Sequence, residues 1–170
     1  MNPYVILEAV LQYNDLPSFL NRAWFCSSGN EISFKQILKE ISEKECEIYV
    51  GADSNPSRLP IVMAVSIAII KKGEFARYFY VRSKPWQNKK PALQQRLQDE
   101  VTLSCFIANE IREVLPDRKI VVHADINSDI STASGKFAKQ LKSYITGYGF
   151  IATIKPSSWA ASCIADKYAG

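Results

Sequence analysis

The sequence predicts an α/β fold in which helices flank a mixed five-stranded sheet, made of three antiparallel strands followed by two parallel ones. Three β-rich runs follow one another with short connections, and two later runs are each preceded and followed by helical segments. Short connections allow antiparallel pairing, whereas helices supply the crossovers that parallel strands need. The composition, with 47% apolar and 22% charged residues, is that of a globular domain.

Five runs rich in β-branched and aromatic residues are the expected strands. The second is continuously apolar and therefore largely buried, and the third alternates aromatic with small or basic residues. The runs cover residues 47–53, 61–70, 75–81, 119–125 and 150–154. Right-handed crossovers would place the first and fourth runs side by side in the middle of the sheet.

Apolar residues at helical spacing predict three helices in the same part of the chain. They cover residues 91–115, ended by Pro116, residues 134–146, ended by Gly147, and residues 158–168. We therefore divide the chain into a main domain, residues 47–170, and an N-terminal helical extension, residues 1–46.

The extension is expected to hold two helices, at residues 3–13 and 33–45, with a loop at residues 27–30 between them. Ser33 is a suitable N-cap for the second helix, because Gln36 three positions later can complete a capping box.

Several protein classes are excluded by the sequence. The longest apolar run, residues 61–70, is about half as long as a membrane-spanning helix. The first ten residues lack the basic stretch and apolar core of a secretory signal, so a cytoplasmic location is expected. The 4 cysteines are scattered and the chain has 1 histidine, which argues against a thiolate zinc site or a disulfide framework.

The charge is distributed unevenly. The net charge is +4, but residues 1–46 carry −2, so the remainder carries +6. A basic main domain is compatible with a polyanionic partner such as nucleic acid, although composition alone is weak support.

Two acidic residues follow expected central strands. Asp53 ends the first run and Asp125 ends the fourth, and each precedes a polar turn that contains Ser54 or Asn127. If the strands are neighbours, like charges at their ends raise a pKa or recruit a cation. Oxygen ligands without a cysteine or histidine cluster favour Mg²⁺ or Mn²⁺. Taken singly, each acid is better explained as a solvated surface charge or a cap, and only the joint pattern favours a metal site.

Helices supply two further acids. Glu100 lies at the edge of the apolar stripe of the long helix, and Asp166 lies among small residues of the last one. Either could complete a two-metal site, in which one ion activates a water and the other stabilises the leaving oxygen.

Other polar signals lie around these acids. The loop at residues 84–90 combines positive charge, an aromatic ring and amides, and could bind phosphates and stack a base; the residues that we expect to contact substrate are Ser54, Lys84, Trp86, Asn88, Lys89, Asn127 and Lys155. His123 shares a strand face with Asp125, either as a contact of the metal site or as a core histidine.

Four stretches carry a resemblance to a known family: residues 49–54, 123–127, 147–150 and 155–167. They look like the YkuK-like group of bacterial proteins, which is assigned to the ribonuclease H-like superfamily, and the resemblance covers residues 47–170. It implies the ribonuclease H-like version of the fold above, and two metal ions held by Asp53, Glu100, Asp125 and Asp166. Glu110 is the alternative acid on the long helix; Glu100 is preferred because the superfamily acid occurs early in that helix.

The expected function is therefore a metal-dependent nuclease that hydrolyses phosphodiester bonds of RNA, DNA or their hybrid with two Mg²⁺ or Mn²⁺ ions. The alternatives are a non-catalytic module that binds nucleic acid or protein on the same scaffold, and a phosphoesterase for small nucleotides.

Overall fold

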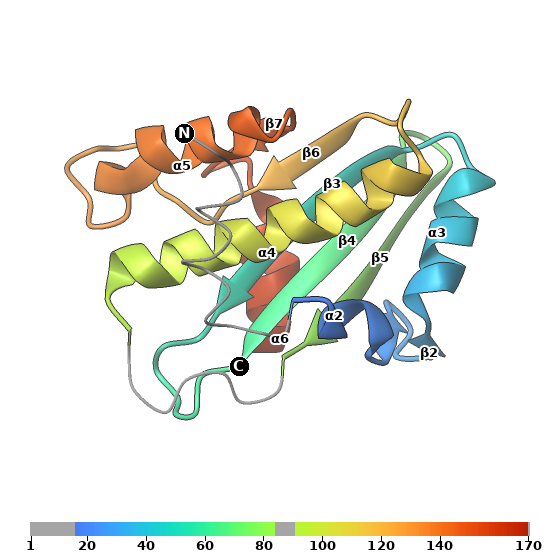
Figure 1. Cartoon of the computed structure of the whole chain (residues 1–170), viewed down its shortest axis with the longest axis horizontal. Helices are drawn as coiled ribbons and strands as arrows, with labels where there is room; N and C mark the ends of the chain where they lie inside the picture. The colour runs from blue at the N-terminus through green and yellow to red at the C-terminus, as the bar shows by residue number, and fades with distance from the viewer. Residues whose placement is uncertain (1–15, 84–90, 170) are drawn as a thin grey trace.

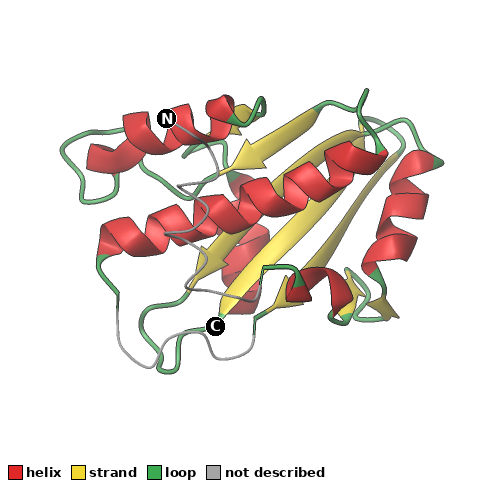
Figure 2. Ribbon diagram, in the orientation of Figure 1, coloured by secondary structure: helices red, strands yellow, loops and turns green. Residues whose placement is uncertain are grey.

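The computed structural model describes residues 16–83 and 91–169 and shows one seven-stranded sheet flanked by helices (Figures 1 and 2). The strands are β1 (Trp24–Cys26), β2 (Glu31–Ile32), β3 (Glu47–Ser54), β4 (Met63–Lys71), β5 (Phe75–Arg82), β6 (Ile120–His123) and β7 (Ile151–Thr153). The helices are α2 (Ser18–Asn21), α3 (Phe34–Ser42), α4 (Leu93–Val114), the 3₁₀ turn η1 (Gly135–Phe137), α5 (Ala138–Gly147), the π-helix η2 (Ala160–Ala165) and α6 (Asp166–Ala169).

The sheet topology confirms the predicted fold class. The strand order is β2-β1-β5-β4-β3-β6-β7; β3, β4 and β5 pair antiparallel, whereas β6 pairs parallel with both β3 and β7. The predicted neighbours are adjacent, with Gly51 of β3 opposite His123 of β6. Both strands therefore end at the same edge of the sheet.

The described part of the N-terminal segment, residues 16–46, contains a hairpin that was not expected. The hairpin β1-β2 extends the sheet, because β1 pairs antiparallel with β5 and sets Phe25 opposite Tyr80. Trp24 is fully buried, and its indole N–H donates to the carbonyl of Phe19 at 2.9 Å. Strands of three and two residues are too short to show a sequence period. The sequence therefore predicted five strands, whereas the described residues form seven.

The second helix of this segment is confirmed. Ser33 caps α3 in a complete capping box: its hydroxyl accepts from the N–H of Gln36, whose side chain accepts from the N–H of Ser33. The other expected helix, residues 3–13, lies outside the described residues.

The helices cover both faces of the sheet. α4 crosses one face, while η2 and α6 lie behind the strands on the other (Figure 1). Gly51 allows η2 to approach, because a Cβ at this position would lie 2.6 Å from the backbone nitrogen of Ala161 and 2.9 Å from the carbonyl carbon of Ala160. A glycine in the middle of β3 thus sets how closely the last helical segment packs.

No helix within residues 16–83 and 91–169 combines the length and the apolar character needed to span a membrane.

Candidate metal-binding active site

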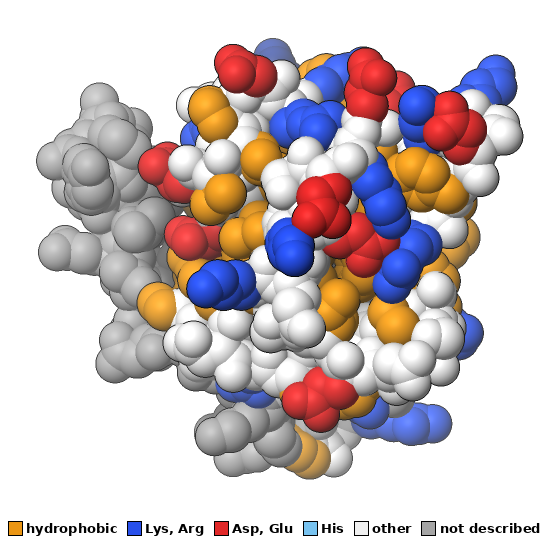
Figure 3. Space-filling view, turned by 90° about the vertical axis from the view of Figure 1, so that its right-hand side faces the viewer, with side chains coloured by type: hydrophobic (Ala, Val, Ile, Leu, Met, Phe, Trp, Pro, Cys, Tyr) orange, Lys and Arg blue, Asp and Glu red, His pale blue; other side chains and the backbone are white. Residues whose placement is uncertain are grey.

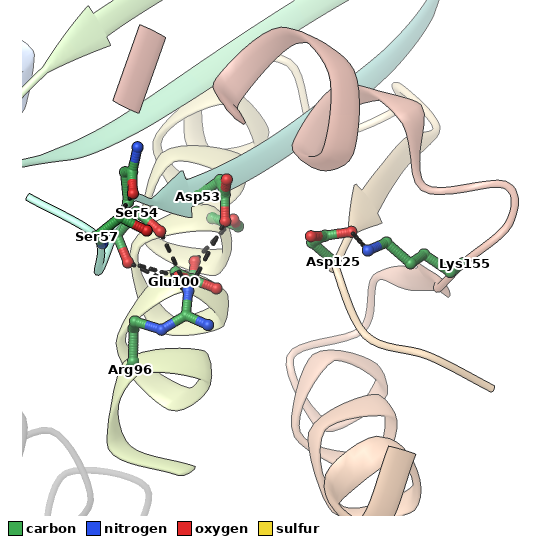
Figure 4. Close-up of polar contacts among 9 residues, drawn as sticks. Asp53, Ser54, Ser57, Arg96, Glu100, Asp125 and Lys155 are labelled. Atoms are coloured by element: carbon green, nitrogen blue, oxygen red, sulfur yellow. Dashed lines mark hydrogen bonds and ion pairs between the residues drawn. The ribbon is translucent and has the colours of Figure 1, made fainter. Parts of the chain in front are cut away.

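The candidate site lies where β3 ends. Side chains alternate along a strand, so Asp53 shares the η2 side of the sheet with Gly51, while Ser54 points to α4. Figure 4 shows Asp53, Ser54 and Glu100 on one side of the site, and Asp125 with Lys155 on the other. Two neighbouring strand ends and the helices on both faces thus supply the acids.

Glu100 is held in a buried network. Its Oε1 accepts from the hydroxyl of Ser54 at 2.6 Å and from Nη1 of Arg96, one turn earlier on α4, also at 2.6 Å. Burial raises the pKa of Glu100 to about 7, although Arg96 and Ser54 favour the charged form; the charge of Asp125 raises it further. The single guanidinium of Arg96 therefore offsets only part of the cost of burying the charge of Glu100.

Asp53 lies at the centre of the acidic group and is 5% exposed. Its Oδ1 lies 4.0 Å from Nη1 of Arg96, at the outer limit of an ion pair. The pKa of Asp53 is raised to about 8. Burial is the largest cause, and repulsion from Glu100 and Asp125 and the nearby side chain of Asp166 raise it further. Three acids far apart in sequence are thus close enough to Asp53 to disfavour its charge.

Asp125 follows β6 and forms an ion pair with Lys155, whose Nζ lies 2.8 Å from Oδ1. The same oxygen is buried and has no hydrogen bond of acceptable geometry, so the ammonium neutralises its charge without filling its lone pairs. Lys155 is 44% exposed at the side chain and can exchange this partner for another.

Asp166 is the first residue of α6 and directly follows the π-helix η2. Single π-helical turns occur often at functional sites, where the extra residue shifts the side chains that follow. Asp166 is exposed as a residue, in contrast to buried Asp53 with which its side chain bonds. It therefore forms the solvent side of the acidic group.

The four acids fit a hard divalent cation by chemistry but do not form a closed cage. Within residues 16–83 and 91–169, no three or more acidic, histidine or cysteine side chains are grouped so that they could hold a metal ion. The donors are all oxygens, and burial and mutual repulsion raise the pKa values of Asp53 and Glu100, so a bound cation would relieve the cost of charging these two acids. Arg96 and Lys155 supply the counter-charges present.

The residues expected to contact substrate differ in their surroundings, and some of them lie outside the described residues. Ser54 is buried and its hydroxyl donates to Glu100, so it orients that acid. Asn127 accepts the N–H of Asp129 at 2.9 Å and thereby shapes the loop after β6. Lys155 faces Asp125. The remaining expected residues, Lys84, Trp86, Asn88 and Lys89, lie outside the described residues.

His123 is a core residue that positions η2. Its Nδ1 accepts the backbone N–H of Ala160 at 3.0 Å, and its ring lies 5.1 Å from that of Tyr49 and 5.2 Å from that of Trp159. Burial lowers the pKa of His123 to about 4, so the imidazole is neutral at physiological pH. Of the two interpretations of this histidine, the structure supports the core one.

One site residue, and one buried acid next to Glu100 in the sequence, were not expected. Arg96 bonds Glu100, and the only sequence signal was its position four residues before that acid. Asp99 is 5% exposed, its Oδ2 has no hydrogen bond, and burial raises its pKa to about 6. Glu110, the alternative to Glu100, lies about 15 Å farther along α4 by helical rise, away from Asp53.

The comparisons with known proteins agree with this architecture. A family model described as ribonuclease H-like matches residues 32–170. Comparison with curated proteins gave no significant match, and comparison with solved structures gave none either. Because the family model spans most of the chain, including every strand from β3 to β7 and all four acids of the candidate site, the chain belongs to the ribonuclease H-like family.

Proposed function

We propose that this protein is a metal-dependent nuclease that hydrolyses phosphodiester bonds of RNA, DNA or their hybrid. The observation that carries the proposal is that Asp53 and Glu100 lie 4.0 Å and 2.6 Å from the same guanidinium nitrogen of Arg96, with Asp125 and Asp166 close enough to raise the pKa of Asp53. The narrower assignment to the YkuK-like group is also a proposal and rests on the sequence motifs.

In this proposal Asp53, Glu100, Asp125 and Asp166 would hold two Mg²⁺ or Mn²⁺ ions. Bound divalent metal would supply the activation of a water and the stabilisation of the leaving oxygen. The protein's own groups position the acids. Ser54 and Arg96 hold Glu100, and Lys155 neutralises Asp125 until another cation replaces it.

The test is cleavage of labelled single-stranded RNA, single-stranded DNA and hybrid duplex in Mg²⁺ or Mn²⁺. We expect Asp53→Asn to reduce cleavage to background, because it removes the charge at the centre of the acidic group. The matched control is Asp117→Asn, which makes the same change at an exposed residue and should cleave like the parent. Equal cleavage by parent and Asp53→Asn would contradict the proposal.

A second function, a non-catalytic nucleic-acid-binding module, is favoured by one observation. Arg96 and Lys155 already pair with Glu100 and Asp125, and the described acids are not grouped as a metal cage. Titration with Mn²⁺ distinguishes the two functions: a nuclease binds metal in an Asp53-dependent manner and turns over, whereas a binding module retains oligonucleotides without turnover.

We predict that Lys155→Gln lowers the metal concentration needed for half-maximal binding. Lys155 competes with metal for Oδ1 of Asp125, and a partly exposed ion pair is worth at most about 1 kcal/mol, which corresponds to a change of up to about fivefold. Calorimetric titration with Mn²⁺ measures the effect, with Lys119→Gln as the exposed control. Weaker metal binding in Lys155→Gln would show instead that the lysine supports the site.

A further inference from the structure

A groove of about 590 Å³ runs beside α5, and no residue of its lining belongs to the acidic site. Its lining comes from η1 and α5, from the loop after β6, and from Ile154, which directly follows β7. The residues that characterise it are Ile130, Lys136, Lys139, Lys142, Ser143 and Ile154.

The groove is positively charged. Lys136, Lys139 and Lys142 follow one another at three-residue spacing, which places them as neighbours on one face of η1 and α5. All three are exposed, none forms an ion pair with a residue that the structure describes, and no acid belongs to the described lining. Like charges at this spacing repel, so the arrangement is unfavourable for α5 alone and is relieved by a bound anion.

The charges at one other end of the molecule show a different pattern. At the end of the molecule that carries α3, acidic and basic side chains alternate (Figure 3). There Lys44 and Arg77 both pair with Glu40, and Lys71 pairs with Glu74. The unpaired lysines of the groove therefore differ from the neutralised charges at that end, and they differ from single unpaired lysines such as Lys119 in that three of them line one groove.

One end of the groove adjoins the candidate active site. Its lining includes Ser128, three residues after Asp125, and Ile154, next to Lys155. The two segments are joined there, because the backbone N–H of Lys155 donates to the carbonyl of Ile126 at 3.0 Å and its ammonium pairs with Asp125. The segments that carry Asp125 and Lys155 therefore continue directly into the lining of the groove.

We infer that this groove binds the phosphodiester backbone of a nucleic-acid strand that extends from the candidate active site. The inference rests on the proposed function, since it places part of the same substrate. The three ammonium groups contact successive phosphates, and Ile130, which is 75% exposed, offers an apolar contact to a sugar or base. Such contacts position a strand and carry no sequence information.

The test compares two triple variants that remove the same charge. Lys136→Gln, Lys139→Gln and Lys142→Gln are combined in one, and Lys35→Gln, Lys72→Gln and Lys119→Gln, all exposed and without a described ion pair, in the other. Fluorescence anisotropy with labelled 20-nucleotide RNA and DNA in EDTA, at several salt concentrations, measures affinity without turnover. Thermal unfolding of each variant confirms that it folds.

We expect the groove variant to bind at least about tenfold more weakly at low salt and the control variant to bind within about twofold of the parent. The slope of log affinity against log salt should fall by about two to three in the groove variant, as expected for three lost phosphate contacts. Equal affinities of the two triple variants, or no binding of either oligonucleotide by the parent, would overturn the inference.

Failure of this inference is distinguishable from failure of the proposed nuclease. If the parent does not cleave in Mg²⁺ or Mn²⁺ but the groove variant loses binding in EDTA, the groove stands and the nuclease proposal fails. If the parent cleaves and the groove variant binds like the parent, the nuclease proposal stands and the groove inference fails. In a cleaving parent, the groove variant should raise KM for a 20-nucleotide substrate and leave KM for a 4-nucleotide substrate unchanged.

Discussion

Asp53→Asn should raise the thermal midpoint of the metal-free protein at pH 8 and abolish the further rise that Mg²⁺ or Mn²⁺ causes in the parent. The pKa of Asp53 is raised from 3.8 to about 8 by burial first and then by Glu100 and Asp125. The folded state therefore holds a proton that the unfolded chain has released, and stability falls as pH rises between about 4 and about 8. Asparagine has no charge to bury.

The expected gain in the free energy of unfolding at pH 8 is about 2–3 kcal/mol. This is less than the full pKa shift implies at 1.36 kcal/mol per unit, because Asp53 and Glu100 repel each other and the energetic cost of burying charge is shared between them. For a chain of 170 residues this corresponds to roughly 5–10 °C. Differential scanning calorimetry at pH 4, 6 and 8, with and without metal, measures it.

The control for this prediction is Asp117→Asn, an exposed position where the same substitution should leave the midpoint and its metal dependence unchanged. At pH 4 the thermal midpoints of Asp53→Asn and the parent should become equal, since the side chain at position 53 is then neutral in both folded proteins. A gap that is independent of pH, or a metal-induced rise retained in Asp53→Asn, would contradict the account of Asp53 as a buried acid that binds cations.

Gly51→Ala should be strongly destabilising. The new methyl group would lie 2.6 Å from the nitrogen of Ala161 and 2.9 Å from two further backbone atoms of Ala160 and Ala161, none of which can rotate away. The sheet and η2 must separate, and overpacking of this kind costs about 1–3 kcal/mol or more. Urea unfolding measures the loss of stability.

Because η2 leads directly into Asp166, we also expect the metal-induced stabilisation to weaken in Gly51→Ala. Gly147→Ala is the matched control, since a Cβ there meets nothing within 4 Å and its backbone is helical. That variant should be neutral or gain up to about 1 kcal/mol. If the two alanine variants unfolded at the same urea concentration, the close approach of η2 to β3 would not be a constraint on the fold.

The adjacency of β3 and β6 could be predicted from the sequence because each of the five expected runs has a strong local signal and crossovers have a preferred hand. That adjacency is what places Asp53 beside the strand that leads to Asp125. Glu100 was preferred over Glu110 only through the family resemblance, and the buried bond from Ser54 now distinguishes the two. The hairpin β1-β2 was missed because such short strands are defined by their pairing with β5, which lies far along the chain.

The amino-acid order was sufficient for the α/β class, the central pair of parallel strands and the two acids that follow them, Asp53 and Asp125, since all three follow from local periodicity and chain topology; Glu100 and Asp166 were added by the family resemblance. Tertiary packing alone decided which cations neutralise those acids: Arg96 for Glu100, and Lys155 for Asp125. It also turned Ser54 inward and made His123 a support for η2. Such pairings depend on distances of a few ångströms between elements remote in sequence, and charge interactions at that range change steeply with burial.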